Sequence, residues 1–180
     1  MKNIFFCLII SLVFLGCSSP AFTSYLSTSN PIFITENIKG KSFSISSQNF
    51  SENFENNLSS ALIQNGYKKA TKNPDIAIKI TLNYLRQNSD IKNNNFMEFG
   101  FGSGGFRHVG FGSSFGNGYE NEYFYDAQAS LLIALKDSNN YQTNLNLQSQ
   151  KSSFEYPQTQ AIDSFELKII SKIIEILNGF

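Results

Sequence analysis

Two segments place apolar residues at three- and four-residue spacing, which predicts amphipathic helices. The first covers about residues 51–65 and the second about residues 159–177. Asn49 or Ser51 is expected to cap the first helix, and Gly66 is expected to end it in the left-handed conformation. Each helix has a single apolar stripe, so both helices are expected to cover the same face of a sheet.

Other segments alternate apolar and polar residues and predict strands with one buried face. These are residues 76–85, residues 123–136 and the segment that starts at Tyr141, with shorter β-prone runs at 32–34 and 43–45. In the first long strand, the even-numbered residues from Ile76 to Tyr84 form the expected buried face. The odd-numbered residues, ending at Leu85, form the mixed face.

The order of these elements predicts one α+β domain over residues 31–180. We expect an antiparallel sheet of three to five strands with two helices packed on one face. A Gly/Phe-rich loop, residues 96–119, is inserted between two of the strands. Removal of residues 1–16 would leave 164 of the 180 residues, which suits a single domain with its own core.

The N-terminus has the pattern of an export signal. A basic start is followed by an apolar run over residues 4–15, which is too short to span a bilayer as a helix. Gly16 and Cys17 then match the end of a bacterial lipobox, so we predict a signal peptide at 1–16 and fatty acids such as palmitate on Cys17. The alternative is an ordinary secretory signal with a coincidental cysteine.

Residues 17–30 are expected to form the lipidated cysteine and a flexible, Ser/Thr-rich tether. Residues 18–30 could reach at most about 45 Å when fully stretched. The tether would attach the domain to the outer membrane, facing either the periplasm or the surface.

Composition excludes several functions. The 14 basic and 14 acidic residues balance, so charge gives no reason to expect nucleic acid. Cys7 lies in the expected signal peptide, which leaves Cys17 as the single cysteine and excludes disulfides and cysteine-based metal sites. We expect no catalytic, cofactor-binding or metal site, and no small-molecule substrate is evident.

The Gly/Phe-rich loop holds eight of the twelve glycines of the chain and six phenylalanines. Exposed phenylalanine favours burial, whereas glycine makes order costly. One hypothesis is therefore a contact element for a partner subunit or for lipid, formed by Phe99, Phe101, Phe106, Phe111 and Phe115. The alternatives are a flexible insertion or a ragged hairpin that extends the sheet.

Two short sequences in this loop match catalytic or cofactor-binding motifs, but neither has the neighbouring elements or residues that its motif requires. Residues 100–105 match a dinucleotide-binding glycine pattern, but no helix is expected after them. Residues 112–116 match a nucleophile elbow, yet the single histidine, His108, precedes them instead of following. We therefore predict that the protein is not an enzyme. A separate string around Asn57 matches a bacterial glycosylation acceptor inside the first helix, where such acceptors are awkward.

Several short motifs occur along the chain in the same order as in one known protein family. They are Pro31-Ile32-Phe33-Ile34, Phe43-Ser44-Ile45-Ser46, Asn65-Gly66-Tyr67, Asn73-Pro74-Asp75 and Asn83-Tyr84-Leu85. Together with the lipobox, they resemble the TraT-type surface-exclusion and complement-resistance lipoproteins of the bacterial outer membrane. The chain is also similar to small envelope lipoproteins of unknown function.

The resemblance implies a non-enzymatic outer-membrane lipoprotein that acts through protein contacts, with a protein partner or as a homo-oligomer. An envelope-assembly accessory of the lipopolysaccharide-transport type is the alternative. Ser18 after the cysteine resembles the sorting residue for outer-membrane delivery.

Overall fold

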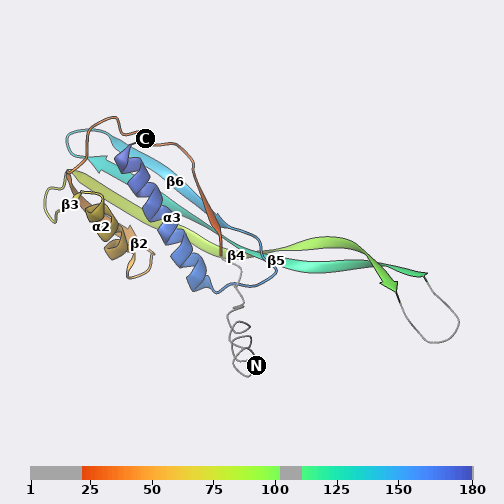
Figure 1. Ribbon diagram of the computed structural model, residues 1–180. Coiled ribbons are helices and arrows are strands. Elements are labelled where there is room, and N and C mark those ends of the chain that lie inside the picture. Colours follow the sequence, from red (N-terminus) through yellow and green to blue (C-terminus); the bar gives the residue numbers. More distant parts are fainter. Residues whose placement is uncertain (1–21, 102–110, 180) are drawn as a thin grey trace, which may run out of the picture.

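The structure, a computed structural model, describes residues 22–101 and 111–179, and residues 92–101 and 111–119 are described by their backbone pairing. Its sheet is covered on one face by two helices, as predicted (Figure 1). The elements are β1 Ser24–Thr28, β2 Ser42–Gln48, α2 Phe54–Gln64, β3 Lys68–Lys69, β4 Ile76–Phe101, β5 Phe111–Leu135, β6 Asn140–Ser149 and α3 Gln158–Asn178.

The sheet has six strands in the order β1-β6-β5-β4-β2-β3, more than the three to five expected. It is also mixed, whereas the sequence analysis expected an antiparallel sheet. β2 runs parallel to β3 and β4, and the other neighbouring strands are antiparallel. The parallel pairing follows from the connection: α2 lies between β2 and β4, and a helical crossover returns the chain in the same direction.

The domain starts earlier than expected, because part of the predicted tether is a strand. β1 pairs with β6 along the edge of the sheet. Ser24 is buried, and its hydroxyl lies 2.7 Å from the Ser164 hydroxyl of α3. Just before β1, the ring of Phe22 lies edge-on to Tyr156, with centroids 5.2 Å apart. The folded body therefore already includes Phe22 and β1, which precede Pro31.

The core lies between the sheet and the two helices. Its largest fully buried side chains come from β2, α2, β4, β5, β6 and α3: Phe43, Phe54, Leu58, Leu62, Ile76, Ile78, Ile80, Leu131, Ile133, Leu145, Ile169 and Ile173. The β-prone run 32–34 is not a strand, although Ile32 is buried and belongs to this core. Among the described residues, no helix is both long and apolar enough to cross a membrane.

The ends of α2 are partly as predicted. Gly66 has a φ of 90°, in the left-handed region that glycine adopts without strain. The N-terminal cap is Asn53, not Asn49 or Ser51, and its side chain makes no capping bond. Ser51 instead donates its backbone N–H and its hydroxyl to Glu166 of α3, and α2 begins only at Phe54.

A β-bulge between Leu82 and Tyr84 reverses the predicted alternation at the end of the long strand. Before the bulge, Ile80 pairs with Leu131 on the core side; after it, Leu85 pairs with Ala127. Leu85 therefore packs against the core, and Tyr84 is exposed on the opposite face. The sequence analysis placed these two residues the other way round, because it assumed an unbroken period of two.

The expected Gly/Phe-rich loop is largely a hairpin. β4 continues to Phe101 and β5 starts at Phe111, so most of residues 96–119 are in strands. Figure 1 shows the two strands leaving the body as a long ribbon. We call residues 91–101 and 111–121 the arm. Backbone pairing explains the correction: glycine and asparagine disfavour strands on their own, but a partner strand satisfies their backbone groups.

Candidate functional site

The sequence-predicted contact residues fall mainly on the arm. Phe99 and Phe101 are in β4, whereas Phe111 and Phe115 are in β5. Cys17, Phe106 and His108 lie outside the described residues. The hypothesis of a contact element therefore concerns a two-stranded ribbon and not an irregular loop.

The arm is paired without interruption from Ile91↔Asn121 to Phe101↔Phe111. In the described part of the chain, these residues pair only with one another, because the β6 partners of β5 stop at Asp126. A strand of this length extends roughly 35 Å at 3.3–3.4 Å per residue. A two-stranded hairpin that stands alone is marginally stable in water, so the arm would gain from a second surface.

The register gathers the aromatic positions of the arm. Phe101 is paired with Phe111, Met97 with Phe115, and Phe99 with Ser113. Directly paired positions share a face, as do positions two residues apart. The sequence of the arm is therefore richer in large apolar residues at one set of alternating positions than at the other, where Gly100 and Gly112 are paired.

The root of the arm is braced by the segment that follows β6. The backbones of Tyr123 and Ser152 form a β-bridge, with N···O distances of 2.7 and 3.0 Å. The Gln87 amide donates to Glu155 at 2.8 Å, and the Tyr125 hydroxyl donates to the Tyr156 carbonyl at 2.8 Å.

Farther along the root, Lys151 pairs with Asp90, and its ammonium lies 5.4 Å from the Phe124 ring centroid. The pairing raises the pKa of Lys151, chiefly through the hydrogen bond to Asp90. The brace thus ends close to the first residues of the arm.

A second feature lies on the helix-free face of the sheet. It is an open groove of about 510 Å³ that crosses β4, β5, β6 and β1. Its lining combines aromatic rings with planar polar side chains, among them Tyr25, Tyr84, Arg86, Asn88, Asp126 and Gln148. The other described cavities lie beside the arm root, at the C-terminal end of α3 and under α3.

Strand register explains why these residues meet. Arg86 is paired with Asp126, Asp126 with Gln148, and Gln148 with Tyr25, so one row crosses four strands. A neighbouring row carries Tyr84 of β4, paired with Gln128. The bulge is essential to this arrangement, since it brings Tyr84 and Arg86 to the helix-free face.

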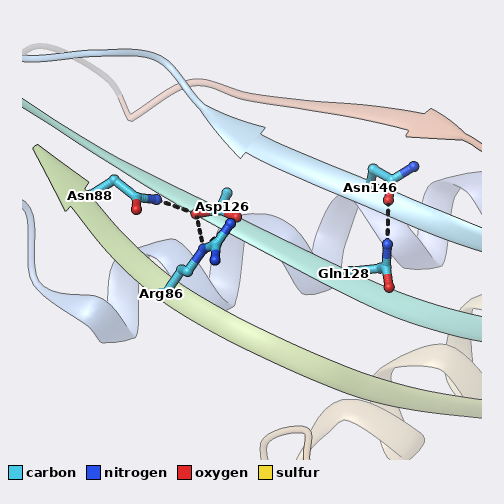
Figure 2. Close-up of polar contacts among 5 residues, drawn as sticks. All are labelled: Arg86, Asn88, Asp126, Gln128 and Asn146. Carbon is cyan, nitrogen blue, oxygen red and sulfur yellow. Dashed lines mark hydrogen bonds and ion pairs between the residues drawn. The ribbon is translucent and has the colours of Figure 1, made fainter. Parts of the chain in front are cut away.

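Hydrogen bonds hold the charged part of the groove in place. The Arg86 Nε donates to both carboxylate oxygens of Asp126, at 2.9 and 3.0 Å, and Asn88 donates its amide to the same carboxylate (Figure 2). The bond to Asp126 raises the pKa of the Arg86 guanidinium further above its usual value. The guanidinium carbon lies 5.0 Å from the centroid of the Tyr84 ring, within the range of a cation–π contact.

A ladder of amides continues across the neighbouring row. Asn83 donates to Gln128 at 3.2 Å, and Gln128 donates to Asn146 at 2.9 Å (Figure 2). Asn146 in turn donates to the Ser29 hydroxyl at 3.3 Å. The outward amides of β6 were predicted as a solvated face, but their connection to Tyr84 and Arg86 was missed. The only available signal was Leu85, an apolar residue on the expected polar side.

The remaining candidate motifs keep no catalytic geometry in the described chain. Residues 112–116 lie inside β5, whereas a nucleophile elbow requires a turn from a strand into a helix. Asn57 is exposed within α2. In residues 22–101 and 111–179, no three His, Cys, Asp or Glu side chains gather in a way that could hold a metal ion.

No family model and no curated protein matches the chain. Similar solved structures include a minor lipoprotein from Acinetobacter baumannii, with 12% identity, a TM-score of 0.37 and coverage of 75% of this chain and 93% of that chain. A PelC dodecamer from Paraburkholderia phytofirmans has 12% identity, a TM-score of 0.36 and coverage of 87% and 98%.

The rare lipoprotein B from Shewanella oneidensis has 10% identity, a TM-score of 0.33 and coverage of 76% and 88%. At these identities and TM-scores, the similarities carry no argument about family or function. None of the three is described as a TraT-type protein, so that resemblance stays a prediction from the sequence.

Proposed function

We propose that the protein is a non-enzymatic lipoprotein of the bacterial outer membrane, anchored by acylation of Cys17, that binds a protein partner through the β4–β5 arm. The anchor is supported by the export pattern of residues 1–16 and by the Gly16-Cys17 pair. A lipid at Cys17 would be followed closely by the folded body, of which Phe22 is already a part.

The arm is the observation that carries the proposal. Its strands extend beyond every other strand of the sheet, and among the described residues they pair only with each other. The backbone of this ribbon is paired outside the part of the sheet that the two helices cover. Its phenylalanine-rich sequence would therefore be stabilised by contact with another protein.

Site-specific photo-crosslinking in intact cells tests the contact. A photoreactive amino acid replaces Phe99 in one strain, and Leu167 of α3, which is 64% exposed, in a matched control strain. We expect the Phe99 position to give a discrete adduct that the Leu167 position does not give. Adducts that are identical at both positions, or none from Phe99, would contradict the proposal.

The mass of the adduct separates the two functional alternatives. An adduct with twice the mass of the mature chain indicates a homo-oligomer. An adduct with a larger envelope protein favours the assembly-accessory function. In both cases the partner is reached through the arm.

A shortened arm provides a second test. Residues 93–119 are replaced by Asn-Gly, so that Lys92 and Glu120, which are paired in the structure, flank a two-residue turn. We expect the unfolding temperature of the body to be retained and the partner to be lost. An unchanged set of partners in a crosslinked pull-down from intact cells, compared between the shortened and the wild-type chain, would exclude the arm as the contact element.

The anchor is tested separately. Cells that express the full-length chain or a Cys17→Ala variant are labelled with a fatty-acid probe and fractionated. We expect label and outer-membrane association for the full-length chain and neither for the variant. An unlabelled wild-type chain, cleaved after residue 16 and free in the periplasm, would support the ordinary secretory signal instead.

A further inference from the structure

The groove on the helix-free face joins exposed aromatic rings to an ordered set of hydrogen-bonding side chains. We propose that this groove binds a neutral oligosaccharide. The proposal does not depend on the arm or on lipidation, because every residue that carries it belongs to the folded body.

The aromatic rings stand on opposite sides of the groove. Tyr25 of β1 is 60% exposed, and Tyr84 of β4 is 40% exposed. β1 and β4 are three strand spacings apart in the sheet order, which corresponds to about 14 Å. Each ring offers a flat apolar surface with a polar hydroxyl at its end. The C–H face of a sugar ring is flat and apolar in the same way, so it can stack on either side of the groove.

The floor between the rings supplies matching polar groups. Gln148, Asn146 and Asn88 are amides, and each amide can donate and accept hydrogen bonds, as a sugar hydroxyl does. The amides of Gln128 and Asn146 are already bonded to each other at 2.9 Å. Asn88 is likewise bonded to Asp126, so these two lining amides, Asn146 and Asn88, lose little conformational entropy on binding.

The balance of charges in the groove indicates that the saccharide it binds is neutral. The carboxylate of Asp126 neutralises Arg86, so the groove has no surplus cation for a phosphate or an acidic sugar. Both hydrogen bonds of this pair use the Arg86 Nε, which leaves the terminal amino groups of the guanidinium as donors for hydroxyls. A nucleic acid would require several uncompensated cations, which the described lining lacks.

Other ligand classes fit the groove less well. An extended peptide adds to the free edge of a sheet, but the groove crosses the faces of four strands that are already paired. An acyl chain requires mainly apolar walls, whereas six of the twelve residues that line this groove have polar or charged side chains. The combination of rings and amides is the chemistry that recognises a sugar.

The test measures binding to the mature full-length protein in a detergent without a sugar headgroup. Isothermal titration calorimetry uses three neutral hexasaccharides as probes: β-1,4-linked glucose, α-1,4-linked glucose and β-1,4-linked N-acetylglucosamine. We expect saturable binding of at least one of them. The absence of heat from all three at millimolar concentration would overturn the proposal.

Variants locate the binding to the groove. Tyr25→Ala and Tyr84→Ala should each weaken binding roughly two- to tenfold, since each removes one stacking ring. Tyr84→Phe keeps the ring and should weaken it less than Tyr84→Ala. The matched control is Phe154→Ala, at a 65% exposed aromatic outside the groove, which should change nothing. Equal losses in the control and the groove variants, or no loss in either tyrosine variant, would overturn the proposal.

Discussion

Ser51 donates its backbone N–H and its hydroxyl to the two carboxylate oxygens of Glu166, each at 2.8 Å. Glu166 is only 6% exposed, although it lies on the otherwise apolar inner side of α3. The pair joins the loop before α2 to the middle of α3. Each oxygen of a carboxylate that would be costly to bury is therefore satisfied.

Glu166→Gln should lower the free energy of unfolding by about 1–3 kcal/mol, because the amide replaces one accepting oxygen by a donor. Urea unfolding followed by circular dichroism measures the change. Asp163→Asn, at an exposed position on the same helix, is the control and should have little effect. Equal stabilities of the two variants would show that the Ser51 bonds contribute nothing.

Asn49 supports the bulge that creates the groove. Its φ is 65°, and its amide donates to the Leu82 carbonyl at 3.1 Å, directly at the register shift. Asn49→Ala should cost about 1–2 kcal/mol of stability, because it loses this bond and places alanine in the left-handed region. Asn49→Gly should cost less, since glycine keeps the positive φ without strain.

The control for these variants is Asn53→Ala, at the cap of α2, where φ is −90° and the side chain makes no capping bond. The midpoint of urea unfolding should rank the control as the most stable, then Asn49→Gly, then Asn49→Ala. The reverse order of the two Asn49 variants would argue against backbone strain at this position.

Asp75 should make the free energy of unfolding depend on pH in the acid range. Ser42 donates its hydroxyl at 2.6 Å and its backbone N–H at 2.9 Å to this carboxylate, and these bonds hold the pKa of Asp75 below its ordinary value. A lowered folded-state pKa favours the charged form. Its contribution is therefore complete above the unfolded-state pKa and is lost as pH falls through the folded-state pKa.

An NMR titration of the Asp75 carboxyl carbon measures this pKa directly. In Ser42→Ala the pKa should move up toward that of an unperturbed aspartate. Ser46→Ala, at an exposed position on the same strand, should leave it where it is. A titration curve that is the same in all three proteins would refute the assigned cause.

Tyr67 should make the free energy of unfolding depend on pH in the alkaline range. Its hydroxyl donates to the Leu177 carbonyl at 2.8 Å near the end of α3, and burial raises the pKa of this tyrosine above 10.0. Its contribution is present below the unfolded-state pKa and is lost as pH rises through the folded-state pKa. Tyr67→Phe should cost about 1 kcal/mol at neutral pH and should reduce the alkaline loss.

Thermal unfolding at pH 8 and at pH 10.5 separates these effects. The control is Tyr25→Phe, at a 60% exposed tyrosine, which should unfold like the wild type at pH 8. If Tyr67→Phe lost as much stability at high pH as the wild type does, the alkaline effect would have another origin.

Periodicity predicted the elements that form the core. The three-and-four spacing of the helices and the alternation in β5 and β6 reflect burial against one another, so the same residues appear in the observed core. Leu145 and Leu147 face inward as predicted, with amides on the opposite side. These elements were predictable because each carries its own apolar pattern.

The missed features depend on partners distant in the sequence. β1 has one partly buried leucine, Leu26, beside the exposed Tyr25, two serines and one threonine, and it is a strand because β6 supplies its hydrogen bonds. The arm contains many glycines and asparagines and is ordered by the pairing of β4 with β5. The β1 segment has no periodic signal of its own, whereas the rough alternation within the arm had allowed the alternative of a ragged hairpin that extends the sheet.

The groove could not be predicted for a related reason. Its main row brings Arg86, Asp126, Gln148 and Tyr25 together from four strands, and no two of them are close in sequence. The row also requires the bulge, which a strict alternation of residues from 76 to 85 conceals. Contact between separate strands, and not the pattern within one, creates this surface.

Phe22 packs against Tyr156, so a lipid on Cys17 would lie only five residue steps before the described part of the protein. Five residue steps can span at most about 18 Å, far less than a linker that continued to residue 30. The Tyr156 carbonyl also accepts the hydrogen bond of the Tyr125 hydroxyl at the base of the arm. Phe22 and the base of the arm therefore lie at the same end of the molecule. With the lipid at Cys17, as proposed, the length of the β4–β5 arm would set the distance from the membrane at which the protein can contact a partner. A partner would therefore have to approach the membrane.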